Sequence, residues 1–456
     1  MRLALVKRIG IVAALCLAAP IPCRGDESLM ENVKRLCEDY LEGFGSAQTG
    51  LAYHHRLNGP TGLDVLERPE EIAKGRVRGK DMPYGYGSGI QDVALENGHL
   101  LIALCEAHEA TGDEFFAQTA RRIFEGMKLV ATVSPEPGFV PRGPHPDGRS
   151  YYRDSSLDQH TTFVYALWRY HRSPLATGAD KAFIASELQE IAERLERYDW
   201  GIRVEDGGEV AHVGFSWLQF TRVGATVLLA VLAAVQDVTG DAHWEALYEE
   251  LGAEKSGRRW ELLSATPEAE WAPFTLYSNQ FPVGLAVLGD TETDPEKRQS
   301  LAAYRDSMAE RMLRSNVFDE SAWRRLDWAG NFPDKANRPD DWEEQETEKL
   351  LAPFGLSLGR PTAAADLLSK FDPELLGAQD WRIRKVNEKL CFGVPTVAFH
   401  AALLADDPAL GTEIAPHVRD MVRKMLVGGE LYTHGENYNR AVVLSLHLLA
   451  LEHRAR

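Results

Sequence analysis

Apolar residues recur at helical spacing along almost the whole chain. Ile184, Leu188, Ile191 and Leu195 share one face of a predicted helix, and charged residues occupy the opposite face. The segment 414–426 repeats the same design. The alternating polarity that is typical of strands is limited to short pieces such as 208–213. The pattern therefore predicts an almost entirely helical protein.

The predicted helices fall into two alternating classes. One class is apolar on most sides, which is typical of a helix that is buried all round. The other class follows the short turns and is amphipathic, with one charged face. The apolar class comprises 89–110, 155–172, 215–238, 276–288, 389–405 and 437–452.

Short turns join each apolar helix to the amphipathic helix that follows it. In most of them a glycine precedes an aspartate, so that the glycine ends one helix in a left-handed conformation and the aspartate caps the next. The first four turns lie about 50 to 65 residues apart, which indicates a repeat of helical hairpins. The turns are at 111–113, 177–180, 239–241, 288–290 and 405–408.

Six buried helices, each with an amphipathic partner, predict an all-α fold, an (α/α)6 toroid of helical hairpins. A solenoid of hairpins is the alternative, and it would need amphipathic stripes on both helices of each pair. We expect one domain over residues 26–456, with an irregular insertion around 316–381.

The N-terminus has the composition of a cleaved signal peptide. Lys7 and Arg8 precede an apolar run that ends at Ala19 and is too short to span a bilayer. Small residues before Asp26 favour cleavage there, and Pro22 disfavours the alternative of a lipidated Cys23. We therefore expect a signal peptide over residues 1–25 and a secreted or periplasmic protein that makes no membrane contact after cleavage.

Charge and cysteine content exclude several classes of protein. The net charge is −18, and it is near −22 without residues 1–25, so we expect no nucleic-acid partner. Cys37, Cys105 and Cys391 are far apart and form no zinc-binding pattern, which favours buried free thiols. Aspartate and asparagine at 327–334 are interpreted as turn residues rather than calcium ligands. No metal and no other cofactor is therefore expected, and the oligomeric state stays open.

Long connections lie at the other end of the predicted hairpins. They are rich in Gly, Pro and aromatic residues, and they precede the N-termini of the buried helices, where backbone N–H groups favour anions. Long loops inside a compact domain usually carry function, so we expect the active site at this end. The connections are 45–87, 134–153, 200–214, 255–275, 316–341 and 428–436.

Polar residues stand at the starts of these apolar helices, where a plain core would hold Leu or Val. Asp158 lies in the first turn of a buried helix and Asp92 at the start of the preceding buried helix, and we take both as catalytic candidates. Asp154 is interpreted as a helix cap. The binding candidates at the other helix starts are His160, Trp217, Gln219, Arg222, Tyr277, Asn279, His434, Tyr438 and Arg440.

One loop runs against the acidic character of the chain. Arg142, Arg149 and Arg153 cluster with His145 and two tyrosines within residues 141–153. Such a loop suits a small anion such as a carboxylate, and Arg149 and Arg153 are binding candidates for that reason. The alternative, that these arginines pair with acids of their own loop, is equally open.

The hairpin repeat, the signal peptide and the acids at buried helix starts resemble the six-hairpin glycosidases, and among them the unsaturated glucuronyl and related uronyl hydrolases. That resemblance implies a catalytic aspartate on each of two successive inner helices, which correspond to Asp92 and Asp158. It also implies a Trp and an Arg-Gly pair near the uronate. The segment 217–224 matches this in part, since Val223 separates Arg222 from Gly224.

The leading hypothesis is a hydrolase of acidic, uronic-acid-containing oligosaccharides, with Asp158 as general acid and base and Asp92 supporting it. The first alternative keeps the toroid but makes the protein a polysaccharide lyase that uses Tyr438 or a histidine as base. A sugar epimerase on the same fold is less favoured for an exported protein. The last alternative is a sugar-binding protein without catalysis.

Overall fold

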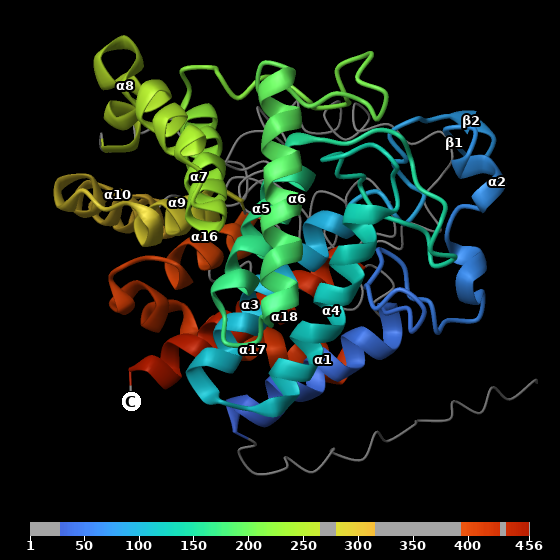
Figure 1. Ribbon diagram of the computed structural model, residues 1–456. Coiled ribbons are helices and arrows are strands. Elements are labelled where there is room, and N and C mark those ends of the chain that lie inside the picture. Colours follow the sequence, from blue (N-terminus) through green and yellow to red (C-terminus); the bar gives the residue numbers. More distant parts are fainter. Residues whose placement is uncertain (1–27, 265–279, 315–393, 429–434, 456) are drawn as a thin grey trace, which may run out of the picture.

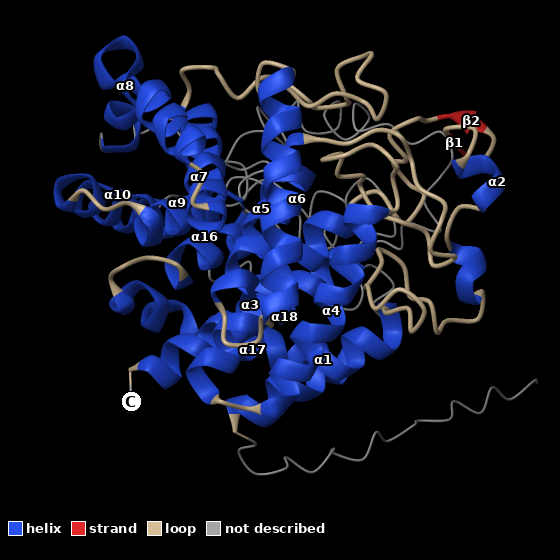
Figure 2. Ribbon diagram, viewed as in Figure 1, coloured by secondary structure: helices blue, strands red, loops and turns tan. Residues whose placement is uncertain are grey.

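Helices form most of the described part of the protein. The computed structural model describes residues 28–264, 280–314, 394–428 and 435–455 (Figure 1). Within these ranges the named strands are a small antiparallel pair, β1 (Arg76–Val77) and β2 (Lys80–Asp81), beside the short helix α2 (Figure 2). The all-α prediction is confirmed. The predicted signal peptide and the insertion around 316–381 lie outside the described residues.

Most helices are 16 to 23 residues long and follow one another as hairpins. Their bounds are α1 Leu29–Phe44, η1 Gly62–Val65, α2 Pro69–Ile72, α3 Val93–Thr111, α4 Glu114–Thr132, α5 Leu157–Arg172, α6 Gly178–Arg197, α7 Arg222–Thr239, α8 Ala242–Ser264, α9 Gln280–Thr291, α10 Pro295–Arg314, α16 Val394–Leu403, α17 Pro408–Gly428 and α18 Gly435–Arg454.

Three of the predicted turns join helices as the sequence indicates. Gly112 ends α3 with a φ of 67°, and the Asp113 carboxylate accepts the backbone N–H of Phe115 at the start of α4. Gly240 ends α7 in the same left-handed conformation, with a φ of 64°. Before α17 the Asp407 carboxylate accepts the N–H of Ala409.

Two predicted turns are placed differently. Gly178 does not end α5 but is the first residue of α6, where Thr177 and Asp180 form a reciprocal capping box. Gly289 lies inside α9, which runs on to Thr291. Gly289 has helical neighbours on both sides, and α5 already ends at Arg172, before Gly178, so glycine alone did not mark the helix end.

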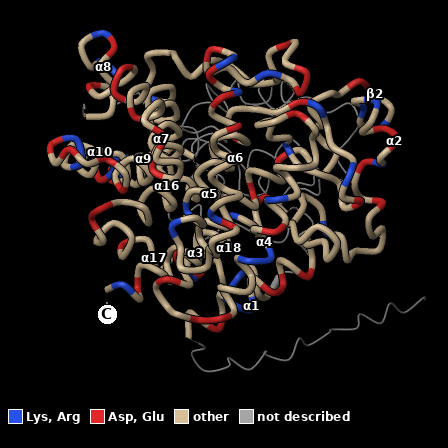
Figure 3. Tube along the Cα trace, in the orientation of Figure 1, with Lys and Arg blue, Asp and Glu red and all other residues tan. Residues whose placement is uncertain are grey.

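The two classes of helix differ in burial as predicted. Most residues of α3, α5, α7 and α18 are buried, from 12 of 18 in α7 to 13 of 16 in α5, whereas α4 and α6 bury one face. Figure 3 shows residues of both charges along α8 and α10. α7 alone among the described helices has the length and hydropathy to cross a membrane, but 67% of that window is buried in the fold, as in a core helix. Cys37 and Cys105 are buried free thiols, as predicted, and Cys391 lies outside the described residues.

The buried helices contact one another in the order α16, α18, α3, α5, α7, α9. α10 contacts both α9 and α16, while α1 and α17 pack against α18. The starts of α3, α5 and α18 are therefore neighbours. The long connections that precede α3 and α5 are packed over the same end of the molecule (Figure 1).

Candidate active site

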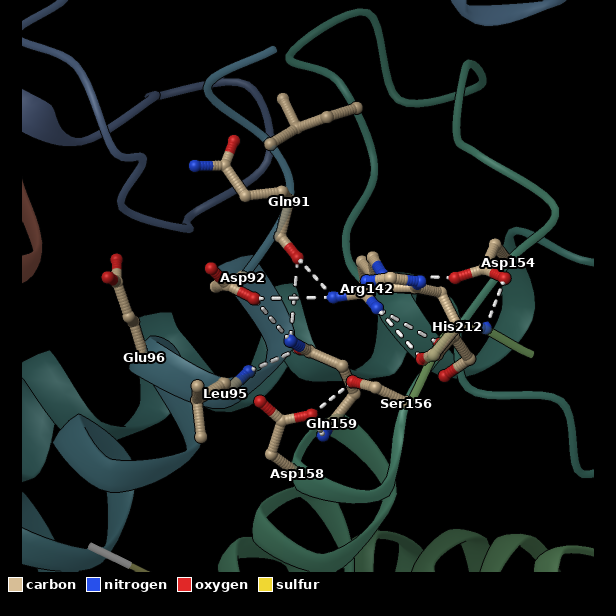
Figure 4. A network of polar contacts seen from close by, with 12 residues as sticks. Gln91, Asp92, Leu95, Glu96, Arg142, Asp154, Ser156, Asp158, Gln159 and His212 are labelled. Carbon is tan, nitrogen blue, oxygen red and sulfur yellow. Dashed lines mark hydrogen bonds and ion pairs between the residues drawn. The ribbon is translucent and has the colours of Figure 1, made fainter. Parts of the chain in front are cut away.

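The starts of α3 and α5 bring Asp92 and Asp158 into one cluster of polar side chains (Figure 4). Asp92 precedes the first turn of α3, and its carboxylate makes no capping hydrogen bond to that helix. Asp158 lies in the first turn of α5, is buried, and accepts a hydrogen bond from the Ser156 hydroxyl. The Asp92 carboxylate is therefore turned to other side chains, whereas Asp158 also accepts the backbone N–H of Gln159 in its own helix at 3.2 Å.

Gln159 connects the two helix starts. Its side-chain N–H donates to Asp92 Oδ1 at 2.8 Å and to the carbonyl of Gln91 at 3.4 Å. Its side-chain oxygen accepts the backbone N–H of Leu95 at 2.9 Å. A fully buried amide that uses both ends in this way fixes the position of α5 relative to α3.

Arg142 is the cation at the centre of the cluster. Its guanidinium is buried, with Nη1 3.5 Å from Asp92 Oδ1 and Nε 3.3 Å from Asp154 Oδ1. The guanidinium also donates to the carbonyls of Ser155 and His212. Asp154 therefore forms an ion pair with Arg142, and it also accepts the backbone N–H of His212 at 2.8 Å. The prediction that Asp154 caps α5 is wrong, because Ser156 occupies that position.

The surroundings shift the pKa values of Asp92 and Asp158 in opposite directions. Burial raises the pKa of Asp158, and the negative charge of Asp92 raises it further. Burial also acts to raise the pKa of Asp92, but its contacts with His54 and the charge of Arg142 outweigh this and lower the pKa. Asp92 is therefore the carboxylate of the pair, and Asp158 is the group that more readily holds a proton.

A second group of ionisable side chains lies directly beside Asp92. His54 is fully buried, and its Nε2 is 3.1 Å from Glu96 Oε1 and 3.5 Å from Asp92 Oδ2. One atom each of His54, Glu96 and Glu436 lie within 4.8 Å of one another. Glu96 and Glu436 were visible in the sequence as acids at helix starts, but His54 was not identified. It belongs to the connection 45–87, which carries no periodic pattern that would place it.

Three predicted binding residues lie at or just before the start of α7. Arg222 opens α7 but donates to the carbonyl of Leu262 at 3.0 Å and contacts the Tyr304 hydroxyl at 3.2 Å. Trp217 is buried, with its ring centroid 6.3 Å from that of Trp200. Gln219 is exposed. These contacts join Trp217 and Arg222 to neighbouring segments and leave Gln219 at the surface, so their place in the site stays a prediction.

The residues predicted on α5 and α18 have mixed outcomes. Arg440 reaches the site region, since its Nη2 lies 2.7 Å from Glu436 Oε1. Tyr438 is buried against α1, with its ring centroid 5.6 Å from that of Tyr40, so it packs rather than binds. His160 Nδ1 lies 3.1 Å from the Ser155 hydroxyl, and burial lowers the pKa of this imidazole to about 3.

The basic loop pairs with acids of its own surroundings. Arg142 meets Asp154 and Asp92, and the exposed Arg153 lies 3.3 Å from Glu205. Arg149 is exposed, and its backbone N–H donates to Asp147. Arg142 and Arg153 are therefore paired, but their partners Asp92, Asp154 and Glu205 lie outside residues 141–153, so neither alternative for this loop is confirmed. Tyr277, Asn279 and His434 lie outside the described residues.

Comparisons with known proteins add no relative. No protein-family model matches the chain, and no curated protein sequence matches it. The geometry of Asp92 and Asp158 and the resemblance in the sequence are therefore what point to a function.

Proposed function

We propose that the protein is an exported hydrolase of uronic-acid-containing oligosaccharides, built as an (α/α)6 toroid, in which Asp158 is the general acid and base. The observation that carries the proposal is the pair of neighbouring carboxyl groups with opposite pKa shifts. Such a pair divides the roles of proton donor and charged partner between two chemically identical side chains.

The order of helix contacts supports the toroid. Six buried helices pack as successive neighbours, and each hairpin places an amphipathic helix outside them. Contacts of α10 with both α9 and α16 bring the two ends of this series close together. Catalytic residues at the N-terminal ends of the inner helices then lie around one mouth of the ring.

The proposed reaction uses an unsaturated uronate. Asp158 gives its proton to one carbon of the double bond, and the hydroxyl of a water molecule adds to the other carbon. The remaining proton of that water returns to the Asp158 carboxylate, so the acid is regenerated. The hydrated carbon is a hemiketal whose ring opens to a ketone, and the hemiacetal left at the anomeric carbon then expels the hydroxyl of the next sugar, which breaks the glycosidic bond. Asp92 stays charged beside Asp158 and favours its protonated form at the start of the cycle, while Gln159 holds Asp92 in place.

The contacts of the predicted arginine ligands bear on the substrate, and two observations make the lyase and the sugar-binding protein less favoured. The described contacts of Arg222 and Arg153 are to groups other than the acid pair, and Arg149 is exposed, so the acidic character of the substrate rests on the sequence resemblance. A lyase that used Tyr438 as base is less favoured, because burial raises the pKa of that phenol. Neighbouring carboxyl groups with opposite pKa shifts are typical of sites that transfer protons, which favours catalysis over sugar binding alone.

The test is the ultraviolet absorbance of a short unsaturated uronate oligosaccharide. A hydrolase consumes the double bond that is conjugated to the carboxylate, so we expect the absorbance to fall. Asp158→Asn should reduce the rate by about a hundred- to ten-thousand-fold, because the amide cannot exchange a proton. The control is Asp237→Asn, since Asp237 bonds Trp168 and Arg172 at the opposite end of α5. A rise in absorbance on an intact polymer that survives Asp158→Asn would contradict the proposal and favour a lyase.

A further inference from the structure

We propose that His54, Glu96 and Glu436 bind one divalent transition-metal ion, with Zn²⁺ as the best fit, beside the Asp92–Asp158 pair. The first observation is the convergence of a fully buried imidazole and two carboxylates from three separate segments. One ligand atom from each lies within 4.8 Å of the others. The Nε2 of His54 faces this group and is 3.1 Å from Glu96 Oε1.

The backbone holds His54 in this place from both sides. Its N–H donates to the carbonyl of Gly89 at 3.2 Å, and its carbonyl accepts the N–H of Gly435 at 2.7 Å. Gly435 begins α18, and a Cβ atom there would stand 2.3 Å from the carbonyl oxygen of Tyr53. Only glycine lets the start of α18 approach the His54 segment so closely, which brings Glu436 to the imidazole.

The two glutamates are also held by their own helices. Glu96 lies one turn inside α3, where it is buried, and its backbone carbonyl accepts the side-chain N–H of Asn439 on α18 at 3.2 Å. Glu436 lies in the first turn of α18, where Arg440 fixes one of its oxygens at 2.7 Å. Ligands fixed in this way lose little freedom when an ion binds.

The donor set selects the class of ion. An imidazole nitrogen with carboxylate oxygens suits Zn²⁺ and related transition metals, and Zn²⁺ takes such ligands with further positions left for water. Ca²⁺ and Mg²⁺ prefer sites made of oxygen atoms alone. We therefore expect Zn²⁺ to bind far more tightly than either. The ion would add positive charge next to Asp92 without being required for the reaction proposed above.

The experiment is calorimetric titration of the chelator-treated full chain with Zn²⁺ at pH 7.5, with Ca²⁺ as comparison. We expect one Zn²⁺ per chain and at least a hundred-fold preference over Ca²⁺. Glu436→Gln should weaken Zn²⁺ binding at least about 100-fold, since even changes to residues outside the ligand shell cost about 10- to 100-fold. The control is Glu452→Gln on the same helix, because Glu452 pairs with Arg419.

The outcomes separate a metal site from a buried ion pair of protonated His54. The proposed site would be overturned if Zn²⁺ did not bind at one ion per chain. It would also be overturned if Glu436→Gln and Glu452→Gln changed the Zn²⁺ affinity equally. Should Glu436→Gln fail to fold, X-ray absorption on the Zn²⁺-loaded wild type decides: one imidazole among oxygen ligands supports the site, and a shell without imidazole overturns it. Because the readout is binding, failure here leaves the hydrolase assay untouched.

Discussion

Replacing Arg142 by methionine tests whether the cluster is held together by its buried cation. Methionine keeps much of the apolar stem but removes the charge that lies 3.3 Å from Asp154 and 3.5 Å from Asp92. Removing one partner of a buried ion pair typically costs about 3–5 kcal/mol, because the remaining charge is left uncompensated. We therefore expect the free energy of unfolding to fall by about 3–5 kcal/mol at pH 7.5.

The pH dependence of that loss follows from the two carboxylates. In the wild type the lowered pKa of Asp92 contributes stability that is present above the pKa of the unfolded chain and is lost as the pH falls through the folded value. Without Arg142 the pKa values of Asp92 and Asp154 rise, so both groups protonate sooner. The penalty should therefore be largest at pH 7.5 and should shrink as the pH falls to 5.

Urea unfolding of the wild type and the variant at both pH values measures this effect. The control is Arg194→Met, because Arg194 is also buried but donates to the backbone carbonyls of Val204 and Glu205. Its loss of stability should change little with pH. A loss below about 1 kcal/mol for Arg142→Met at pH 7.5, the level of an ordinary substitution, would refute the reasoning. So would a loss that is equal at the two pH values.

Two further predictions concern stability. Burial lowers the pKa of His99 to about 3 and that of His400 well below its usual value, so both side chains are neutral in the fold. Because the unfolded chain binds protons at these histidines, the free energy of unfolding should fall as the pH drops below about 6.5. His400→Gln should make this fall less steep, as measured by melting curves at pH 7.5 and 5.5. Gly435→Ala should cost about 1–3 kcal/mol through overlap with Tyr53, whereas Gly178→Ala, whose Cβ would meet no atom within 4 Å, should be neutral or stabilising in the same urea assay.

The sequence predicts the helices well because burial repeats along them. The predicted range 89–110 corresponds to α3 at Val93–Thr111, and 155–172 to α5 at Leu157–Arg172. The failure at α9 has a physical cause. Gly289 and Asp290 form a common turn pair, yet the helix continues through them, and Arg305 of α10 packs where a side chain at Gly289 would stand. Tertiary packing there overrides the local preference of glycine.

The two central acids of the site could be predicted, but the residues that tune them could not. Asp92 and Asp158 stand out because a polar residue on a helix buried all round needs a partner. Arg142 looks like part of an exposed basic loop, and only the fold shows that its side chain is buried between Asp92 and Asp154. For a charged residue in a long loop, no pattern in the sequence shows whether its side chain will be buried or exposed.

The sequence predicts that Asp92 supports Asp158, but it does not connect either acid with His54 or Arg142. The fold joins them through Asp92, which lies 3.5 Å from both Arg142 and His54 and thus belongs to both clusters. Anything that changes the charge on the His54 side, whether a proton or an ion, therefore acts on Asp92 and through it on Asp158. The acid strength of Asp158 is then a property of residues drawn from four distant segments: the 45–87 connection, the 134–153 loop, and helices α3 and α5. That dependence explains why helical periodicity alone points to Asp158 but leaves its chemistry undetermined.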